Sequence, residues 1–347
     1  MARYRSRSYS RRRGRTRRWT NIISALLIIA AAIAFIYGRH LFGKNKGQTS
    51  AAFANTNVEN ETDSSVLVAP TPAAKPNLES KSFKIAPEPT SEPNPKVAER
   101  IDEATALINT KPSRIIEARD RLNETLSMRM NSQQRAVVKQ KLSELADKWL
   151  FSRAVFAQDR LCGNYKVKPG DLLRAIGKQH KVPWEILKEV NKIYPPELMK
   201  AGETIKVIHG PFHARIYRST FTMDLYLQET FIRSLPVGLG KPGRETPIGL
   251  WVVKPGGKLI SPPWTDPDTL KRYKADDPDY PLGSRWIGLE GIQGEAEGRI
   301  GFAIHGTKKP EQIGTAGSRG CIRLRDDDVI LTYSLLMPGL SRVEVVE

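Results

Sequence analysis

Cysteine and histidine are scarce in this chain of 347 residues, and acidic residues are absent from its first 58 positions. It contains two cysteines and five histidines. The cysteines, Cys162 and Cys321, are 159 residues apart and form no Cys-x-x-Cys pair, so the sequence offers no metal-ligand spacing. We therefore predict neither a metal nor another cofactor. The two cysteines are candidates either for a structural disulfide or for a reactive thiol.

No Asp or Glu precedes Glu59, and the basic charge is concentrated at the N-terminus. Nine arginines lie between Arg3 and Arg18, and the first 46 residues carry +12 of the formal +18. An uncharged run of 17 residues follows the arginines, from Ile22 to Gly38. That length reaches the lower limit of the ~17–25 residues that a membrane-spanning helix needs. The apolar run accounts for the arginines better than a nucleic-acid partner does, so we predict no nucleic acid.

Because the stronger basic flank precedes the apolar run, we expect a cytoplasmic N-terminus and an exported remainder, on the periplasmic or wall side of the cell membrane. A cleaved signal peptide is the alternative, with Ala32-Ile33-Ala34 as its cleavage site.

The next segment holds seven prolines between Pro70 and Pro95 and few apolar residues, which predicts a disordered linker. From Lys96 onward, apolar residues recur at spacings of three and four, which predicts amphipathic helices.

Within this helical stretch, Pro112 suits a first helical turn, and Asn131 or Ser132 suits the N-cap of the third helix. We interpret the stretch as a spacer or a dimerising element, and the sequence does not define an oligomeric state. The segment from Asn164 to Ile208 opens with Tyr165-Lys166-Val167 and Pro169-Gly170-Asp171, and the string AGETIKV lies at its end. This segment resembles the LysM module, a βααβ unit that binds N-acetylglucosamine polymers. Leu172 departs from the family, which usually has Thr or Ser there.

Short apolar strands separated by Gly and Pro turns fill the rest of the chain, with one helix expected from Asp326–Asp328 to Pro338. His305 closes one strand, and Cys321 follows 16 residues later. A free thiol with a pKa near ~8.5 is mostly protonated at neutral pH, so a catalytic cysteine needs a base such as imidazole beside it. Gly320 permits tight backbone geometry, and N–H groups from Arg319 to Cys321 could stabilise an oxyanion.

The string HGTKKPEQIGTAGSRGCIRL, from His305 to Leu324, resembles the signature of the YkuD-type L,D-transpeptidases, also called the ErfK/YbiS/YcfS/YnhG family. The resemblance extends to Thr246-Pro247-Ile248-Gly249 and to Pro281-Leu282-Gly283. It implies that Cys321 is the nucleophile and His305 its base. It also implies substrate-binding or oxyanion roles for Gly306, Ser318, Arg319, Gly320 and Arg323. An ion pair between Arg323 and a neighbouring aspartate is an open alternative, and the aromatic-rich segment from Lys254 to Leu289 is interpreted as a lid.

The predicted fold class is multidomain, with a mostly-β L,D-transpeptidase catalytic domain, a small βααβ LysM domain, a helical-hairpin segment, a disordered linker and an N-terminal transmembrane helix. The predicted bounds are a basic arm at 1–20, a transmembrane helix at 21–38, a linker at 47–95, a helical spacer at 96–156, a LysM domain at 163–208 and a catalytic domain at 213–346. The resemblance implies peptidoglycan stems and glycan as partners and cysteine-dependent L,D-transpeptidation as the activity. An L,D-carboxypeptidase and a non-catalytic wall-binding scaffold are the alternatives.

Overall fold

The computed structural model of the chain describes residues 89–347. The expected basic arm (1–20), the expected transmembrane helix (21–38) and nearly all of the expected linker (47–95) lie outside the described residues. Within residues 89–347, no helix is both long enough and apolar enough to cross a membrane.

Three helices open the described part of the chain: α2 (Pro95–Asn109), α3 (Ile115–Thr125) and α4 (Ser132–Trp149). Asn131 is the N-cap of α4, as predicted, since its side-chain oxygen accepts a 2.9 Å hydrogen bond from the Gln134 N–H. The expectation for Pro112 is wrong, because α3 begins only at Ile115. Pro112 belongs to the turn after α2, where its carbonyl accepts a 3.0 Å hydrogen bond from Thr110 Oγ1.

The helices pack against one edge of the large C-terminal β-sheet, strand β5 (Thr230–Pro236), and beside its neighbour β4 (Thr222–Leu227). Lys139 Nζ on α4 lies 2.6 Å from the fully buried Asp224 carboxylate on β4. The Asn123 side-chain oxygen accepts a 2.9 Å hydrogen bond from the Phe231 N–H on β5. The helical unit thus contacts this edge of the sheet through specific polar interactions, whereas the sequence predicted a spacer or a dimerising element.

The LysM segment forms the expected βααβ order. Its elements are β1 (Cys162–Lys166), α5 (Leu173–Gln179), α6 (Trp184–Asn191), the 3-10 helix η1 (Pro196–Leu198) and β2 (Thr204–Ile208), with β1 and β2 antiparallel. Leu172 is the N-cap of α5 and makes no capping hydrogen bond, since it has no side-chain acceptor. The buried Asn191 side chain forms hydrogen bonds with the backbone of Lys206 and with Leu187 O, so it connects α6 to β2 inside the module.

A buried lysine joins the LysM segment to the helices. Lys206 is 1% exposed, and its three ammonium protons are directed at the carbonyls of Trp149, Ser152 and Ala154 at 2.5, 2.9 and 2.8 Å. Two of these carbonyls lie at or just beyond the end of α4, where helix carbonyls lack partners within the helix. A cation is favourable at a helix C-terminus, and full hydrogen bonding compensates its burial.

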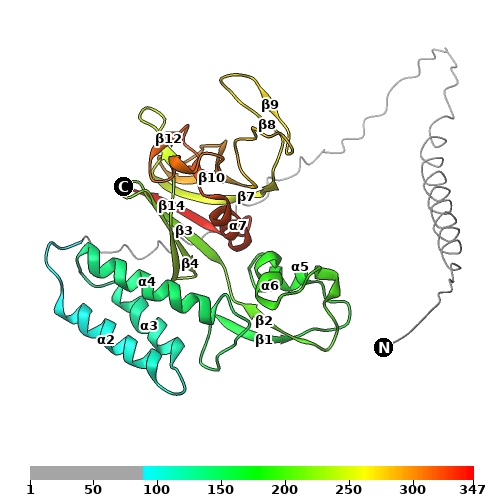
Figure 1. The fold of residues 1–347 in the computed structure, drawn as a ribbon. Coiled ribbons are helices and arrows are strands. Elements are labelled where there is room, and N and C mark those ends of the chain that lie inside the picture. The colour runs from blue at the N-terminus through cyan, green and yellow to red at the C-terminus, as the bar shows by residue number, and fades with distance from the viewer. Residues whose placement is uncertain (1–88) are drawn as a thin grey trace, which may run out of the picture. The chain divides into compact units, whose positions relative to one another are not determined.

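The C-terminal part of the chain, where the sequence predicts the catalytic domain, is built on one eight-stranded mixed sheet in the order β13-β11-β10-β7-β14-β3-β4-β5. Its remaining strands are β3 (Phe212–Tyr217), β7 (Gly249–Ile260), β10 (Arg285–Gly294), β11 (Phe302–His305), β13 (Ile322–Arg323) and β14 (Arg342–Val346). Figure 1 shows β14, in red, between β7 and β3. The mostly-β character that the sequence predicts for this domain is confirmed.

Smaller elements flank the sheet. They are the strand pair β6 (Leu239–Gly240) and β12 (Ala316–Ser318), the hairpin β8 (Trp264–Thr265) and β9 (Arg272–Tyr273), the 3-10 helix η2 (Pro310–Gln312) and helix α7 (Asp326–Leu335). Three aspartates occupy the first turn of α7, where the helix dipole favours negative charge. Trp251 on β7 is fully buried against Phe302 on β11, with ring centroids 5.0 Å apart. This packing fixes the strand that ends in His305.

Candidate functional site

The parallel pair of strands β11 and β13 brings His305 and Cys321 to the same edge of the sheet. Ile304 pairs with Ile322, and His305 pairs with Arg323. Cys321 therefore lies level with Ala303, two residues before His305 on the neighbouring strand. Because residues i and i+2 of a strand point to the same face, this register puts the thiol and the imidazole on one side of the sheet.

The His305 ring is held in one tautomer. It is 4% exposed, and its Nδ1 lies 2.6 Å from the carbonyl oxygen of Gly306. A carbonyl oxygen can only accept, so Nδ1 carries the proton and the lone pair of the ring is on Nε2. The indole of Trp286 on β10 stacks on the ring at 5.6 Å with an interplanar angle of 12°. The ring can then act as a base through Nε2.

Burial also keeps this imidazole neutral. Desolvation lowers the pKa of His305 from 6.5 to about 4, against the opposing effect of the Gly306 carbonyl. The nearby charge of Arg323 lowers the pKa of His305 further. At neutral pH the ring is therefore uncharged.

Two glycines bring the turn after His305 close to the segment before β10. A Cβ on Gly283 would lie 2.6 Å from Gly306 Cα, and one on Gly306 would lie 2.9 Å from Gly283 Cα. Gly283 also has a φ of +66°, which side chains rarely allow. Gly306 therefore acts through its carbonyl and its small size. This contact explains why the Pro281-Leu282-Gly283 match accompanies the histidine motif.

The Cys321 thiol is partly exposed and protonated at rest. Desolvation raises the pKa of Cys321, although the Ala303 N–H and the Arg323 charge oppose the effect. Its Sγ lies 3.9 Å from the Gly301 carbonyl oxygen, which accepts the weak S–H donor. The resting pair thus consists of a thiol and a neutral imidazole.

Hydrogen bonds shape the loop that carries Cys321. The buried Ser318 hydroxyl donates to Cys321 O at 2.6 Å and accepts from the Gly320 N–H at 3.1 Å. Thr246 Oγ1 donates to Gly320 O at 2.9 Å. The Ser318 hydroxyl therefore stabilises the loop, and the Gly320 N–H is already used in a hydrogen bond to it. The N–H groups of Arg319 and Cys321 are left as the oxyanion donors to consider.

Thr246 and Trp286 contact this site but were not predicted as site residues. The sequence did contain a signal for Thr246, since the Thr246-Pro247-Ile248-Gly249 match lies far from Cys321 in the chain and still belongs to the same motif set. Trp286 lies within the aromatic-rich segment from Lys254 to Leu289 that the sequence predicts to be a lid. Nothing in its sequence position identifies the ring that it stacks on.

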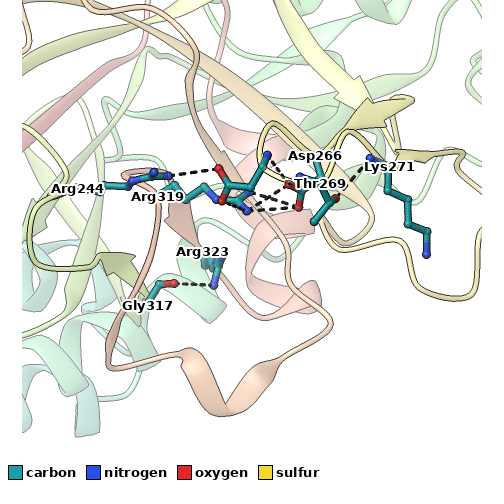
Figure 2. Close-up of polar contacts among 8 residues, drawn as sticks. Arg244, Asp266, Thr269, Lys271, Gly317, Arg319 and Arg323 are labelled. Carbon is teal, nitrogen blue, oxygen red and sulfur yellow. Dashed lines mark hydrogen bonds and ion pairs between the residues drawn. The ribbon is translucent and has the colours of Figure 1, made fainter.

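The two predicted arginines have different partners (Figure 2). Arg323 donates to the side chain of Gln312 and, at 3.4 Å, to Gly317 O, so an ion pair with a neighbouring aspartate is not what the structure has. The ion pairs belong to Arg319, which contacts Asp266 at 3.2 Å and Asp268 at 2.5 Å. Arg319 is therefore occupied by two carboxylates 53 and 51 residues earlier in the chain.

Neither cysteine is in a disulfide. Cys162 is buried, and desolvation raises its pKa to about 12, which makes it an unreactive core residue. Among residues 89–347, no group of three or more His, Cys, Asp or Glu side chains could hold a metal ion.

Comparisons with known proteins agree with the motif. Residues 211–345 match the family model of the L,D-transpeptidase catalytic domain, YkuD, and residues 165–207 match that of the LysM domain. The putative L,D-transpeptidase YkuD of Bacillus licheniformis is 27% identical over 188 residues, which cover 52% of this chain and 97% of that protein. The probable L,D-transpeptidase YcfS of Escherichia coli is 27% identical over 208 residues, which cover 55% of this chain and 64% of that protein.

Solved structures are more distant. An L,D-transpeptidase from Mycobacterium smegmatis has 16% identity and a TM-score of 0.30, with 43% of this chain and 65% of that chain covered. Our chain thus spans slightly less than two thirds of that protein, and so low a score adds nothing about activity. The family matches and the curated relatives confirm the resemblance. The chain therefore carries a YkuD-type L,D-transpeptidase catalytic domain at residues 211–345, with a LysM domain at residues 165–207 before it.

Proposed function

We propose that this catalytic domain works through a Cys321 acyl-enzyme formed on the tetrapeptide stems of peptidoglycan, with His305 as the general base. The observation that carries the proposal is the state of His305. Its Nδ1 lies 2.6 Å from the Gly306 carbonyl oxygen and its ring is neutral, so Nε2 carries the lone pair that would take the thiol proton.

The reaction proceeds in two halves. Nε2 of His305 takes the proton from Sγ as the sulfur attacks the carbonyl carbon of the bond between the L centre of the third stem residue and the terminal D-alanine. The C–N bond then breaks, and the imidazolium protonates the departing amine, which leaves a thioester on Cys321. In the second half an acceptor amine loses a proton to His305, attacks the thioester and restores the thiol.

The negative oxygen of each tetrahedral intermediate needs donors. The backbone N–H groups of Cys321 and Arg319 lie next to the attacking sulfur in the chain, and the Ser318 and Thr246 hydrogen bonds hold that backbone in place. Fixed donors of this kind need no reorganisation during reaction and lower the barrier most in a dry site. Gly320 supports the geometry through its φ of +112°.

Two alternative functions must be distinguished from transpeptidation. If water instead of an amine attacked the thioester, the enzyme would be an L,D-carboxypeptidase. If neither reaction occurred, the protein would be a non-catalytic wall-binding scaffold. A direct test incubates the full chain with purified disaccharide-tetrapeptides and follows the products by mass spectrometry. We expect dimers linked between two third-position residues, with release of D-alanine. Tripeptides alone would favour the carboxypeptidase, and unchanged substrate would favour the scaffold.

The location of the reaction is part of the proposal. The arginine block and the apolar run support a membrane anchor at residues 21–38, with the catalytic domain exported and the N-terminus cytoplasmic. The LysM match supports peptidoglycan glycan as a second binding partner. Together they would keep the enzyme between the membrane and its polymeric substrate.

The pH dependence of acylation should report the neutral histidine. Because burial lowers the pKa of His305 to about 4, kcat/KM should stay level as the pH falls from about 8 to about 5 and should halve near pH 4. An imidazole at its ordinary value would lose half of the rate near pH 6.5. A half-maximal rate near that higher pH would contradict the assigned environment of His305.

Stability must be followed in the same experiment. Since the pKa of His305 is lower in the folded than in the unfolded chain, the unfolded chain takes up the proton first, and stability falls as the pH drops from 6.5 towards about 4. Burial of His213 also lowers its pKa to about 4, so it acts in the same window. Rates are therefore compared only where unfolding curves show folded protein.

A further inference from the structure

The tip of the β8–β9 hairpin is a well-ordered carboxylate turn. Asp266 follows β8, and its Oδ1 accepts hydrogen bonds from the N–H groups of Asp268 at 2.8 Å and Thr269 at 3.1 Å. Its backbone N–H donates to Lys271 O at 2.9 Å. At the base of the hairpin, Trp264 stacks on Tyr273 at 5.9 Å. The hairpin thus presents two carboxylates on a fixed turn.

Both carboxylates bind the arginine that lies two residues before the nucleophile. Figure 2 shows the Arg319 guanidinium in contact with Asp266, and Arg244 extending toward the same cluster. Arg319 Nη1 and Nη2 approach Asp266 at 3.2–3.4 Å, and Nη2 lies 2.5 Å from Asp268 Oδ2. Arg244 adds a looser contact of 3.7 Å to Asp268. The hairpin is therefore tied to the loop that carries Cys321.

This tie is solvent-accessible. The side chains of Arg319 and Asp268 are 34% and 50% exposed, and Asp266 is 17% exposed. Exposed ion pairs are individually weak and are screened by salt. An anion that reaches Arg319 can therefore replace the hairpin carboxylates without first uncovering a buried charge.

We infer that Asp266 and Asp268 form a latch that occupies Arg319 in place of a substrate carboxylate, so that the hairpin and an anionic peptide stem compete for one guanidinium. The inference rests on the proposed function for the identity of the stem. In the closed state the hairpin stands against the Cys321 loop. A donor with a free carboxylate pairs with Arg319 and releases the hairpin, whereas an amidated donor lacks the group that opens the latch.

Access to Cys321 tests the latch without any turnover. The ratio of alkylation rates for a bulky, polyethylene-glycol maleimide and for N-ethylmaleimide cancels changes in thiol reactivity. Asp266→Asn combined with Asp268→Asn removes both charges, while the amide oxygen introduced at the first position can still accept the turn hydrogen bonds. We expect the ratio to rise about three- to tenfold, as for the loss of a few exposed ion pairs. In the unchanged protein, 1 M salt should raise it similarly.

The matched control is Asp276→Asn, which removes an exposed charge of the same segment outside the latch. Its ratio should equal that of the unchanged protein. Labelled peptides are identified by mass spectrometry to confirm that Cys321 is the modified thiol. If neither the double substitution nor 1 M salt changes the ratio of the alkylation rates, the proposal of a latch is wrong.

Competition is tested by binding in a Cys321→Ala background, where no stem can react. The double Asp→Asn change should lower the Kd of a tetrapeptide with free carboxylates about three- to tenfold, and Arg319→Gln should raise it. Amidated tetrapeptides should respond much less to either change. If the Asp and Arg variants shift the Kd in the same direction, Arg319 has only a structural role and the competition is wrong. Because neither assay needs transpeptidation, failure of the proposed reaction would be seen separately.

Discussion

Replacing Cys321 by alanine should lower the rate of acyl transfer from tetrapeptide stems by at least about 10³-fold. The thiol is the group that His305 can activate from the same face of the sheet, and alanine leaves the fold unchanged because Cys321 is partly exposed. The covalent thioester should also disappear from mass spectra of the intact protein. Product analysis and adduct mass measure the two losses independently.

The control is Cys162→Ala. Cys162 is buried, and its Sγ lies 4.0 Å from the Trp149 carbonyl oxygen, so its loss should reduce stability slightly and leave turnover intact. A Cys321→Ala protein that still forms cross-links would remove the nucleophile assignment. A Cys162→Ala protein that folds but has lost the thioester would do the same.

A methyl group added at Gly320 should have the second-largest effect. Gly320 has a φ of +112°, and a Cβ there would lie 2.7 Å from Phe302 Cε1, whose ring already packs on Trp251. We expect Gly320→Ala to lower the free energy of unfolding by about 2–4 kcal/mol. Because the neighbouring Cys321 must move with the loop, the acylation rate should fall at least about 100-fold. Denaturant unfolding and adduct formation measure the two effects.

Gly314→Ala separates backbone strain from the clash. Gly314 has a similar positive φ of +85°, but a Cβ there would meet nothing within 4 Å. Its substitution should cost about 1–2 kcal/mol through the backbone alone and should leave acylation near that of the unchanged protein. Equal effects at the two glycines would mean that the Phe302 contact does not shape the catalytic loop.

The sequence could predict the parts of the site that depend on local chemistry. The His305–Cys321 spacing, the glycine before the cysteine and the strand that ends in histidine all follow from residues close together in the chain. The βααβ order of the LysM domain followed in the same way from its turns and apolar spacing. The roles of Cys321 and His305 stay predictions, which the acyl-transfer assay tests.

What the sequence could not predict depends on pairing between distant segments. Arg319 and Arg323 look equivalent in the motif, and only the folded hairpin decides that Asp266 pairs with Arg319. Lys206 reads as one more surface charge in a basic chain, yet it is buried among three carbonyls. Lysine is rarely buried, and its acceptors come from a helix end more than fifty residues earlier in the chain. No periodicity or spacing rule contains that information.

The resting protonation of Cys321 also bears on how long the enzyme survives. Peroxides oxidise the thiolate far faster than the thiol, and the products beyond sulfenic acid are mostly irreversible. By raising the pKa of Cys321, desolvation leaves little thiolate between catalytic events. In the proposed mechanism His305 removes the proton when a stem carbonyl is in position, so the sulfur would be nucleophilic chiefly in the presence of its substrate. If the catalytic domain is exported, as proposed, Cys321 could in this way persist in an oxidising compartment although it has no disulfide partner.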